Sequence, residues 1–280
     1  MKNLFEYFFF LLAALIVRVL GLKISRRLSI IIAVIFYYII PIRKKVTVKN
    51  LHLAFPDYSE KRIKQIAFGS YKSFAITLIE MLYIPFMNRI EIENAVYCDE
   101  IELVKKTYER GSGLVLLSGH FGNWEYIALS VSTQINVPFH VVVKSQRNPY
   151  VDSYLNKGRT KWINKVVPLG VSIRKIYSEL KSKNIVAMVA DQRGPEDGMR
   201  VSFFNIPSSI YTGPAQLAVK TNAPILYGLA IRQPDYSYKA LISEIDTANL
   251  PEDEELRVME VSQRHMKFLE SAIRRHPEQW

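Results

Sequence analysis

The stretch GLVLLSGHFGNWE, residues 113–125, has the pattern of a buried strand that turns abruptly into a helix. Residues 114–117 form a continuous apolar run, which is expected of a strand covered on both faces. In the turn that follows, one glycine precedes His120 and another comes two residues after it. Asn123 or Gly122 is in position to cap the next helix. The stretch therefore predicts the strand–turn–helix unit of an α/β fold.

His120 and Glu125 are the two side chains in this unit that suit acid–base chemistry. On one continuous helix, residues five apart would point about 140° away from each other, because each residue turns roughly 100°. The two meet only if His120 lies on the turn and Glu125 on the first helical turn, at the carboxyl end of a central strand. The glutamate would then hold one ring nitrogen and leave the other as a base. The simpler interpretation is a turn histidine whose ring bonds to a backbone carbonyl.

The charge distribution separates two classes of partner. The net charge of +11 suits a nucleic acid or an anionic membrane equally well. No acidic residue occurs between Glu6 and Asp57, and most of this interval is apolar apart from basic clusters. That alternation favours a membrane and argues against a nucleic acid. Cys98 is the only cysteine, so no internal disulfide forms, and a cytoplasm-facing location fits.

Residues 4–22 are almost wholly apolar and predict a membrane-anchoring or transmembrane helix, assigned to residues 1–22. Nineteen helical residues span about 28 Å, close to the ~30 Å of a hydrocarbon core. Arg18 lies near the far end, where it can reach the lipid headgroups. Positive charge is concentrated after the segment, which places the rest of the chain in the cytoplasm. A cleaved signal peptide fits less well, because no small-x-small site precedes Lys23.

Residues 28–42 form a second apolar run, short for a membrane span and flanked by basic residues. We expect a helix within 23–45 that lies in the membrane interface or packs on the domain. A buried core helix and a two-span hairpin are the alternatives.

The remainder, 46–280, shows no repeat or low-complexity linker and predicts one globular domain. A helix begins after Ser59, a good N-cap. Strands alternating with helices predict an α/β fold with a largely parallel or mixed central sheet flanked by helices. Expected strands are 90–96, 114–117, 138–144, 185–190, 224–232 and 238–245, and expected helices are 59–83, 99–110, 124–133, 152–162, 174–181, 215–221 and 250–275.

The octapeptide SGHFGNWE, residues 118–125, resembles the HxxxxD/E motif of the glycerolipid and lysophospholipid acyltransferases. The glutamate form preceded by Asn-Trp is similar to the bacterial lipid A late acyltransferases and related mannoside acyltransferases. Asn-Leu at 50–51, Phe-Pro at 55–56 and Glu80 extend the resemblance to roughly 43–280. It implies an acyltransferase-like fold, with 46–280 as a catalytic domain at the bacterial inner membrane, facing the cytoplasm.

The resemblance also implies a reaction. A fatty acyl chain would move from an acyl-carrier-protein or coenzyme A thioester to a hydroxyl of a glycolipid, as in lipid A and lipopolysaccharide biosynthesis. His120 would be the base and Glu125 its orienter. Direct attack by the acceptor is expected, because the chain has no GxSxG serine and Cys98 lacks a catalytic context. No cofactor or metal is expected, since one His and one Glu five apart is not a metal motif.

Candidate substrate-binding residues follow from the same resemblance. Arg159 and Asp191 match an arginine and an aspartate near the motif of the lipid A branch. Arg159 would bind a phosphate or sugar oxygen in bidentate fashion, and Asp191 would hold Arg159 or a substrate hydroxyl. A surface arginine and a strand-end turn aspartate are the simpler interpretations. Further candidates are Asn123, Lys144 and Arg147.

Two other functions remain open. A lysophospholipid or phosphatidylinositol-mannoside-type acyltransferase would use the same chemistry on another lipid acceptor. A membrane-anchored lipid-binding protein without catalysis would use the histidine and glutamate only as structural residues.

Overall fold

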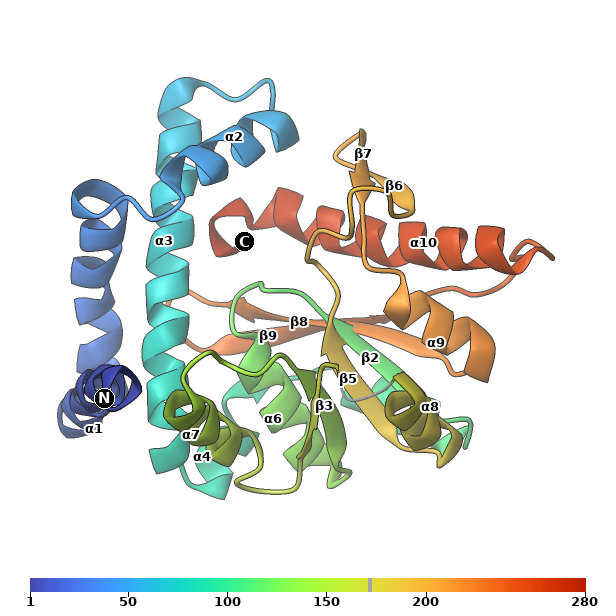
Figure 1. Ribbon diagram of the computed structural model, residues 1–280, viewed down its shortest axis with the longest axis horizontal. Helices are drawn as coiled ribbons and strands as arrows, with labels where there is room; N and C mark the ends of the chain where they lie inside the picture. Colours follow the sequence, from blue (N-terminus) through green and yellow to red (C-terminus); the bar gives the residue numbers. More distant parts are fainter. Residues whose placement is uncertain (171–172) are drawn as a thin grey trace. The chain divides into compact units, whose positions relative to one another are not determined.

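The computed structural model describes residues 1–170 and 173–280 (Figure 1). These residues form two compact units, residues 1–86 with 271–280 and residues 87–270, and each is described by itself. The first unit contains mostly helices: α1 Lys2–Val34, the π-helical turn η1 Ile35–Ile39, α2 Lys44–Ala54, α3 Glu60–Tyr83, and the 3-10 turns η2 Ile84–Phe86 and η3 Pro277–Gln279.

The apolar N-terminal segment is helical, as predicted. Gly21 interrupts α1 with φ 71° and ψ 165°, a conformation that favours glycine, so the helix breaks where the first apolar run ends. Within the described part of the chain, Lys2–Ile39 is the one helical segment that is long and apolar enough to cross a membrane, with a mean hydropathy of 2.2. Arg18 lies over the Phe86 ring, 5.0 Å from its centroid.

The second half of α1 packs against α3 through an unusual face. Its buried residues recur every fourth position and are mostly small: Ser25, Ser29, Ala33 and, in the following turn, Tyr37. The large apolar side chains point outward, among them Leu28, Ile30, Ile31 and Val34. The buried carboxylate of Glu80 on α3 accepts a hydrogen bond from Arg26 Nε at 2.7 Å. The second apolar run is therefore a packed helix and not a core helix, because its large residues are exposed.

Helix α3 begins where the sequence predicts. The Ser59 hydroxyl accepts a hydrogen bond from the Arg62 backbone N–H, which makes Ser59 the N-cap. Ile63 and Ile66 of this helix are buried, whereas Phe74 is 49% exposed.

The second unit is built on a seven-stranded mixed sheet, counted over its described residues, in the order β1-β9-β8-β2-β5-β3-β4. Five neighbouring strands, β8 to β4, run parallel, and β9 runs against them, which confirms the predicted fold class. The strands are β1 Val96–Tyr97, β2 Leu114–Ser118, β3 Phe139–Val143, β4 Lys165–Pro168, β5 Ile185–Val189, β8 Ile225–Arg232 and β9 Tyr238–Glu244, with a separate hairpin of β6 Arg200–Phe203 and β7 Ile206–Ser209.

Helices cover both faces of this sheet. On β8, Tyr227 contacts residues of α10, whereas Gly228 faces Ile127 of α6, because successive strand residues point to opposite faces. Figure 1 shows α10 (red) on one side of the sheet and α6 (green) on the other. The helices are α4 Arg89–Glu93, α5 Ile101–Glu109, α6 Trp124–Ile135, α7 Pro149–Arg159, α8 Ile173–Lys181, α9 Gly213–Thr221 and α10 Glu254–Arg275, whose last five residues belong to the first unit.

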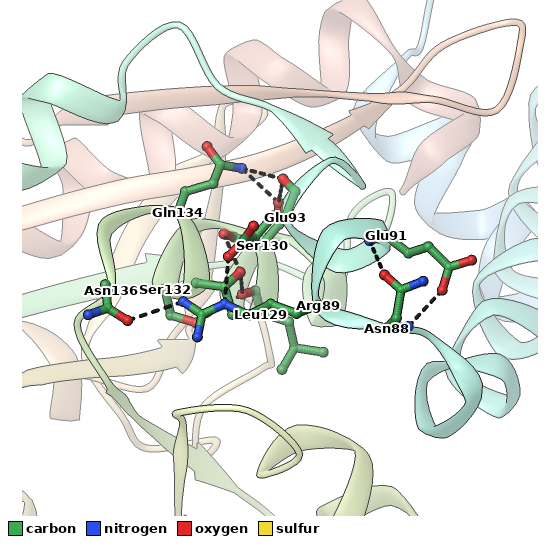
Figure 2. Close-up of polar contacts among 10 residues, drawn as sticks. Asn88, Arg89, Glu91, Glu93, Leu129, Ser130, Ser132, Gln134 and Asn136 are labelled. Carbon is green, nitrogen blue, oxygen red and sulfur yellow. Dashed lines mark hydrogen bonds and ion pairs between the residues drawn. The ribbon is translucent and has the colours of Figure 1, made fainter.

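The strand predicted at 90–96 is wrong, because most of this segment is the short helix α4. A capping box starts it: the Asn88 side chain accepts from the Glu91 backbone, and the Glu91 carboxylate accepts from the Asn88 backbone. Its end is fixed to α6, where Ser130 Oγ and Gln134 Nε2 both donate to the Glu93 carbonyl, at 2.9 and 2.8 Å (Figure 2). These contacts fix the position of α6, the helix that follows the turn at His120.

Candidate active site

His120 lies on the turn between β2 and α6. The turn is tight, since the Phe121 N–H donates to the Gly119 carbonyl at 2.7 Å. Asn123, and not Gly122, caps α6: its Oδ1 accepts from the backbone N–H groups of residues 125 and 126 at 3.1 and 2.9 Å. The Asn123 side chain is fully buried in this role. Its predicted part in substrate binding therefore has no support from the geometry.

Asp191 holds His120. Its Oδ1 lies 2.8 Å from His120 Nδ1, and its Oδ2 accepts the His120 backbone N–H at 2.7 Å. Strand order explains the meeting, because β2 and β5 are parallel neighbours and Ser118 pairs with Val189. His120 comes two residues after Ser118, and Asp191 comes two residues after Val189, so both lie beyond the same edge of the sheet. An ionised carboxylate only accepts hydrogen bonds, so Nδ1 donates the proton and Nε2 is left free for acid–base work.

Opposing effects set the proton affinity of His120. Partial burial, the largest single effect, lowers the pKa of its imidazole, since burial disfavours the charged form. The hydrogen bond that Nδ1 donates to Asp191 and the negative charges of Asp191 and Glu125 outweigh this effect, so the pKa of His120 is raised above its ordinary value. The Trp124 ring stands against the imidazole, with centroids 4.8 Å apart at 67°. The side chain remains 36% exposed, enough for a substrate to reach it.

Glu125 contacts Arg159 and not the His120 ring. Arg159 Nε donates to both carboxylate oxygens at 3.2 and 3.0 Å, and Nη2 donates to Oε1 at 2.5 Å. Arg159 Nη1 donates to Asn156 at 3.0 Å, one turn earlier on α7. The predicted role of Glu125 as orienter of the ring is thus corrected, because Asp191 occupies Nδ1. Burial alone would lower the pKa of Arg159, but the hydrogen bonds to Glu125 and its negative charge raise the pKa above its ordinary value.

The same contacts show where Arg159 and Asp191 lie. The Arg159 side chain is 10% exposed, and each of its three nitrogens donates to Glu125 or Asn156. Asp191 holds His120 and does not pair with Arg159. The sequence contained a signal for Asp191, namely a carboxylate directly after the apolar run 185–190. Asn156 was not predicted, and its signal is the i, i+3 spacing to Arg159 on one helix.

Lys144 and Arg147 follow β3, which pairs with β5 in parallel. Both side chains are exposed, at the edge of the sheet where β2 and β5 also end. They add positive charge at the same edge of the sheet as His120. Within residues 1–170 and 173–280, no group of three or more His, Cys, Asp or Glu side chains is arranged to hold a metal ion.

The structure combines a mixed α/β sheet with an imidazole that a carboxylate holds at the carboxyl ends of two parallel strands. Proteins of this class are suited to moving a proton at a bound substrate. Comparison with known proteins assigns the family. The chain belongs to the bacterial lipid A biosynthesis acyltransferase family, whose model matches residues 2–280. It is therefore an acyltransferase, as predicted, and the interpretation as a non-catalytic binding protein is set aside.

Individual relatives come from two groups of bacteria. The lipid A biosynthesis palmitoleoyltransferase of Escherichia coli (strain K12) is 24% identical over 241 residues, 85% of this chain and 76% of the relative. The lipid A biosynthesis acyltransferase of Shigella flexneri matches equally. The phosphatidylinositol mannoside acyltransferase of Mycobacterium tuberculosis (strain ATCC 25618 / H37Rv) is 29% identical over 120 residues, 41% of this chain and 38% of the relative. These matches confirm the resemblance drawn from the motif.

Proposed function

We propose that this acyltransferase moves a fatty acyl chain from an acyl thioester to a hydroxyl group of a glycolipid, with His120 as the general base. The supporting observation is the His120–Asp191 pair, in which Nδ1 is held and Nε2 is left for the substrate. The names of the relatives support a glycolipid acceptor, since lipid A and phosphatidylinositol mannosides both present sugar hydroxyls.

The geometry supports a direct transfer. His120 Nε2 takes the proton from the acceptor hydroxyl while the hydroxyl oxygen attacks the thioester carbonyl carbon. The tetrahedral intermediate then collapses, the C–S bond breaks, and the imidazolium returns the proton to the departing thiolate. Asp191 keeps the ring oriented and stabilises the imidazolium between the two steps. The thioester belongs to an acyl carrier protein or coenzyme A, both anionic donors.

Charged groups around the pair support this assignment. Glu125 places a second negative charge near His120, and Arg159 balances that charge through a bidentate ion pair. We assign Lys144 and Arg147 to the phosphate groups of the donor or the lipid headgroup, because both are exposed cations beyond β3.

The N-terminal unit supports a membrane location. Large apolar side chains of α1 point outward while small residues form its contact with α3, the arrangement found between helices packed in lipid. We propose that residues 1–22 anchor the enzyme in the bacterial inner membrane, with 23–45 at the interface. The excess of Lys and Arg after residue 22 supports a cytoplasmic location for the remaining chain, 46–280.

The test is single-turnover transfer from labelled acyl-carrier-protein and coenzyme A thioesters into a bacterial lipid extract, with the product identified by mass. His120→Ala should lose roughly 10²–10⁴-fold or more in rate, and Asp191→Asn should lose a comparable factor because the amide cannot stabilise the imidazolium. His52→Ala, a partly exposed histidine in the other unit, is the matched control and should keep full activity. Normal turnover by His120→Ala would reject the proposal.

The product mass also decides between acceptors. A lipid A precursor with one more acyl chain is expected. An acylated phosphatidylinositol mannoside would instead assign the chain to the second candidate function, which the mycobacterial relatives favour.

A further inference from the structure

Tyr227 is a buried polar residue close to the active-site pair that the mechanism above does not use. It lies on β8, which is the parallel neighbour of β2 on the side opposite β5. Its side chain is fully buried, and within the described residues its hydroxyl has no hydrogen-bond partner. A buried hydroxyl without a partner costs free energy, so a role for the group is expected.

The hydroxyl faces Gly119, the residue before His120. A Cβ added to Gly119 would lie 3.3 Å from Tyr227 Oη and 3.4 Å from Asp191 Oδ2. The phenol oxygen and the carboxylate oxygen thus lie on the same side of one glycine, which has no side chain to separate them. Asp191 Oδ2 accepts only the His120 backbone N–H among the described residues, and a carboxylate oxygen has a second lone pair available.

The charge state of Tyr227 suits a donor. Burial, and secondly the negative charge of Asp191, raise the pKa of the phenol well above its ordinary value. The hydroxyl therefore keeps its proton at neutral pH, and the negative charge of Asp191 acts on it.

We propose that Tyr227 is a positioning residue of the active site, whose hydroxyl donates to Asp191 Oδ2 through one water and limits how strongly that carboxylate holds His120. The proposal rests on the proposed role of His120 as the base. A carboxylate that shares its negative charge with a second donor is a weaker acceptor for the imidazolium. Tyr227 thereby keeps His120 from becoming too basic to be neutral at working pH.

The other groups near the pair do not supply this donor. On α10, the His265 ring stacks on Tyr227, with centroids 6.1 Å apart, and burial lowers the pKa of His265 to about 4, so it is neutral at working pH. Phe268 packs on the same ring at 5.1 Å. On α6 and α7, Glu125 and Arg159 are occupied with each other.

The test is the titration of the His120 ring by NMR in histidine-labelled, detergent-solubilised protein, with the His120 signal assigned by its loss in His120→Asn. Tyr227→Phe removes one oxygen, and the pKa of His120 should rise by about half a unit or more. Tyr238→Phe is the matched control: it is a buried tyrosine on β9 whose hydroxyl accepts from Arg232 Nε at 2.7 Å, and it should leave the His120 pKa unchanged.

A second replacement works in the opposite direction. The more acidic hydroxyl of 3-fluorotyrosine at position 227 is a stronger donor in nearly the same shape, so the pKa of His120 should fall. In the active enzyme, the acid limb of the pH profile of kcat/KM should move with the NMR value in both variants. An unchanged His120 pKa in both replacements, with a native melting curve, overturns the proposal. Because the titration needs no turnover, it tests the role of Tyr227 independently of the acyl-transfer assay.

Discussion

At the scale of single residues, the site contains two carboxylates with different tasks. Asp191 is 71 residues from His120 in the chain and touches both its ring and its backbone. Glu125 is five residues away and touches neither, since its oxygens face Arg159. Chain proximity is thus a poor guide to which carboxylate orients a catalytic ring, because a turn can point neighbouring side chains in different directions.

Arg159→Lys tests the bidentate pair. Lysine keeps the positive charge but has no planar fork, so Glu125 loses two of its three hydrogen bonds and the buried charges are less well matched. We expect transfer to fall at least tenfold and Tm to fall by several degrees, since a buried pair with poor geometry destabilises the fold. Arg193→Lys, which replaces a 72% exposed arginine, is the control for the chemical change. Unchanged rate and Tm would show that the charge of Arg159 suffices.

At the scale of elements, the contact between α1 and α3 combines small buried residues of α1 with one ion pair, while large apolar residues of α1 are exposed. Small residues let the two helices approach closely, while the exposed large residues would face lipid. The Arg26–Glu80 ion pair fixes this contact, with the Glu80 carboxylate fully buried.

Glu80→Gln is expected to destabilise the first unit. It leaves the Arg26 charge with a neutral partner in a largely buried place, at a cost of about 3 kcal/mol. Tm of the detergent-solubilised enzyme should fall by about 6 °C or more. Glu60→Gln, on the same helix in a pair with His52 and 67% exposed, is the control and should shift Tm by about 1 °C or less. Equal melting of both variants would contradict a stabilising role for the buried pair.

At the scale of the whole molecule, the charge of +11 is unevenly distributed. The first 56 residues contain one acidic residue, Glu6. Some of their cations are engaged within the unit, such as Arg18 over Phe86 and Lys44 over Tyr37. Apart from Arg18, the exposed cations are the ones available to anionic headgroups, and they are Lys2, Lys23, Arg27, Arg43, Lys45 and Lys49.

Removal of residues 1–22 should weaken membrane binding without abolishing it. This deletion ends just after the helix break at Gly21. The remaining exposed cations should bind vesicles with anionic lipid at low salt and release them at 1 M NaCl, where the Debye length is about 3 Å. The full chain should stay bound at the same salt. Vesicle sedimentation measures both, and salt-resistant binding of the shortened chain would reject an anchoring role for residues 1–22.

The sequence by itself determined the local features. The apolar run and the turn residues predicted β2, the exposed turn of His120 and the α/β class, because these depend on neighbours in the chain. The N-caps Ser59 and Asn123 and the apolar N-terminal helix followed from the same kind of pattern. One local prediction failed, since the capping box at Asn88 outweighed the strand preference of the isoleucines after it.

Only the tertiary structure decided which groups meet. The order of strands places β5 and β8 on either side of β2, which brings both Asp191 and Tyr227 close to Gly119 in the His120 turn. The docking of α7 turns Arg159 toward Glu125 and takes that carboxylate away from the ring. Both outcomes depend on contacts between residues tens of positions apart, and single-chain periodicity contains no information on strand order.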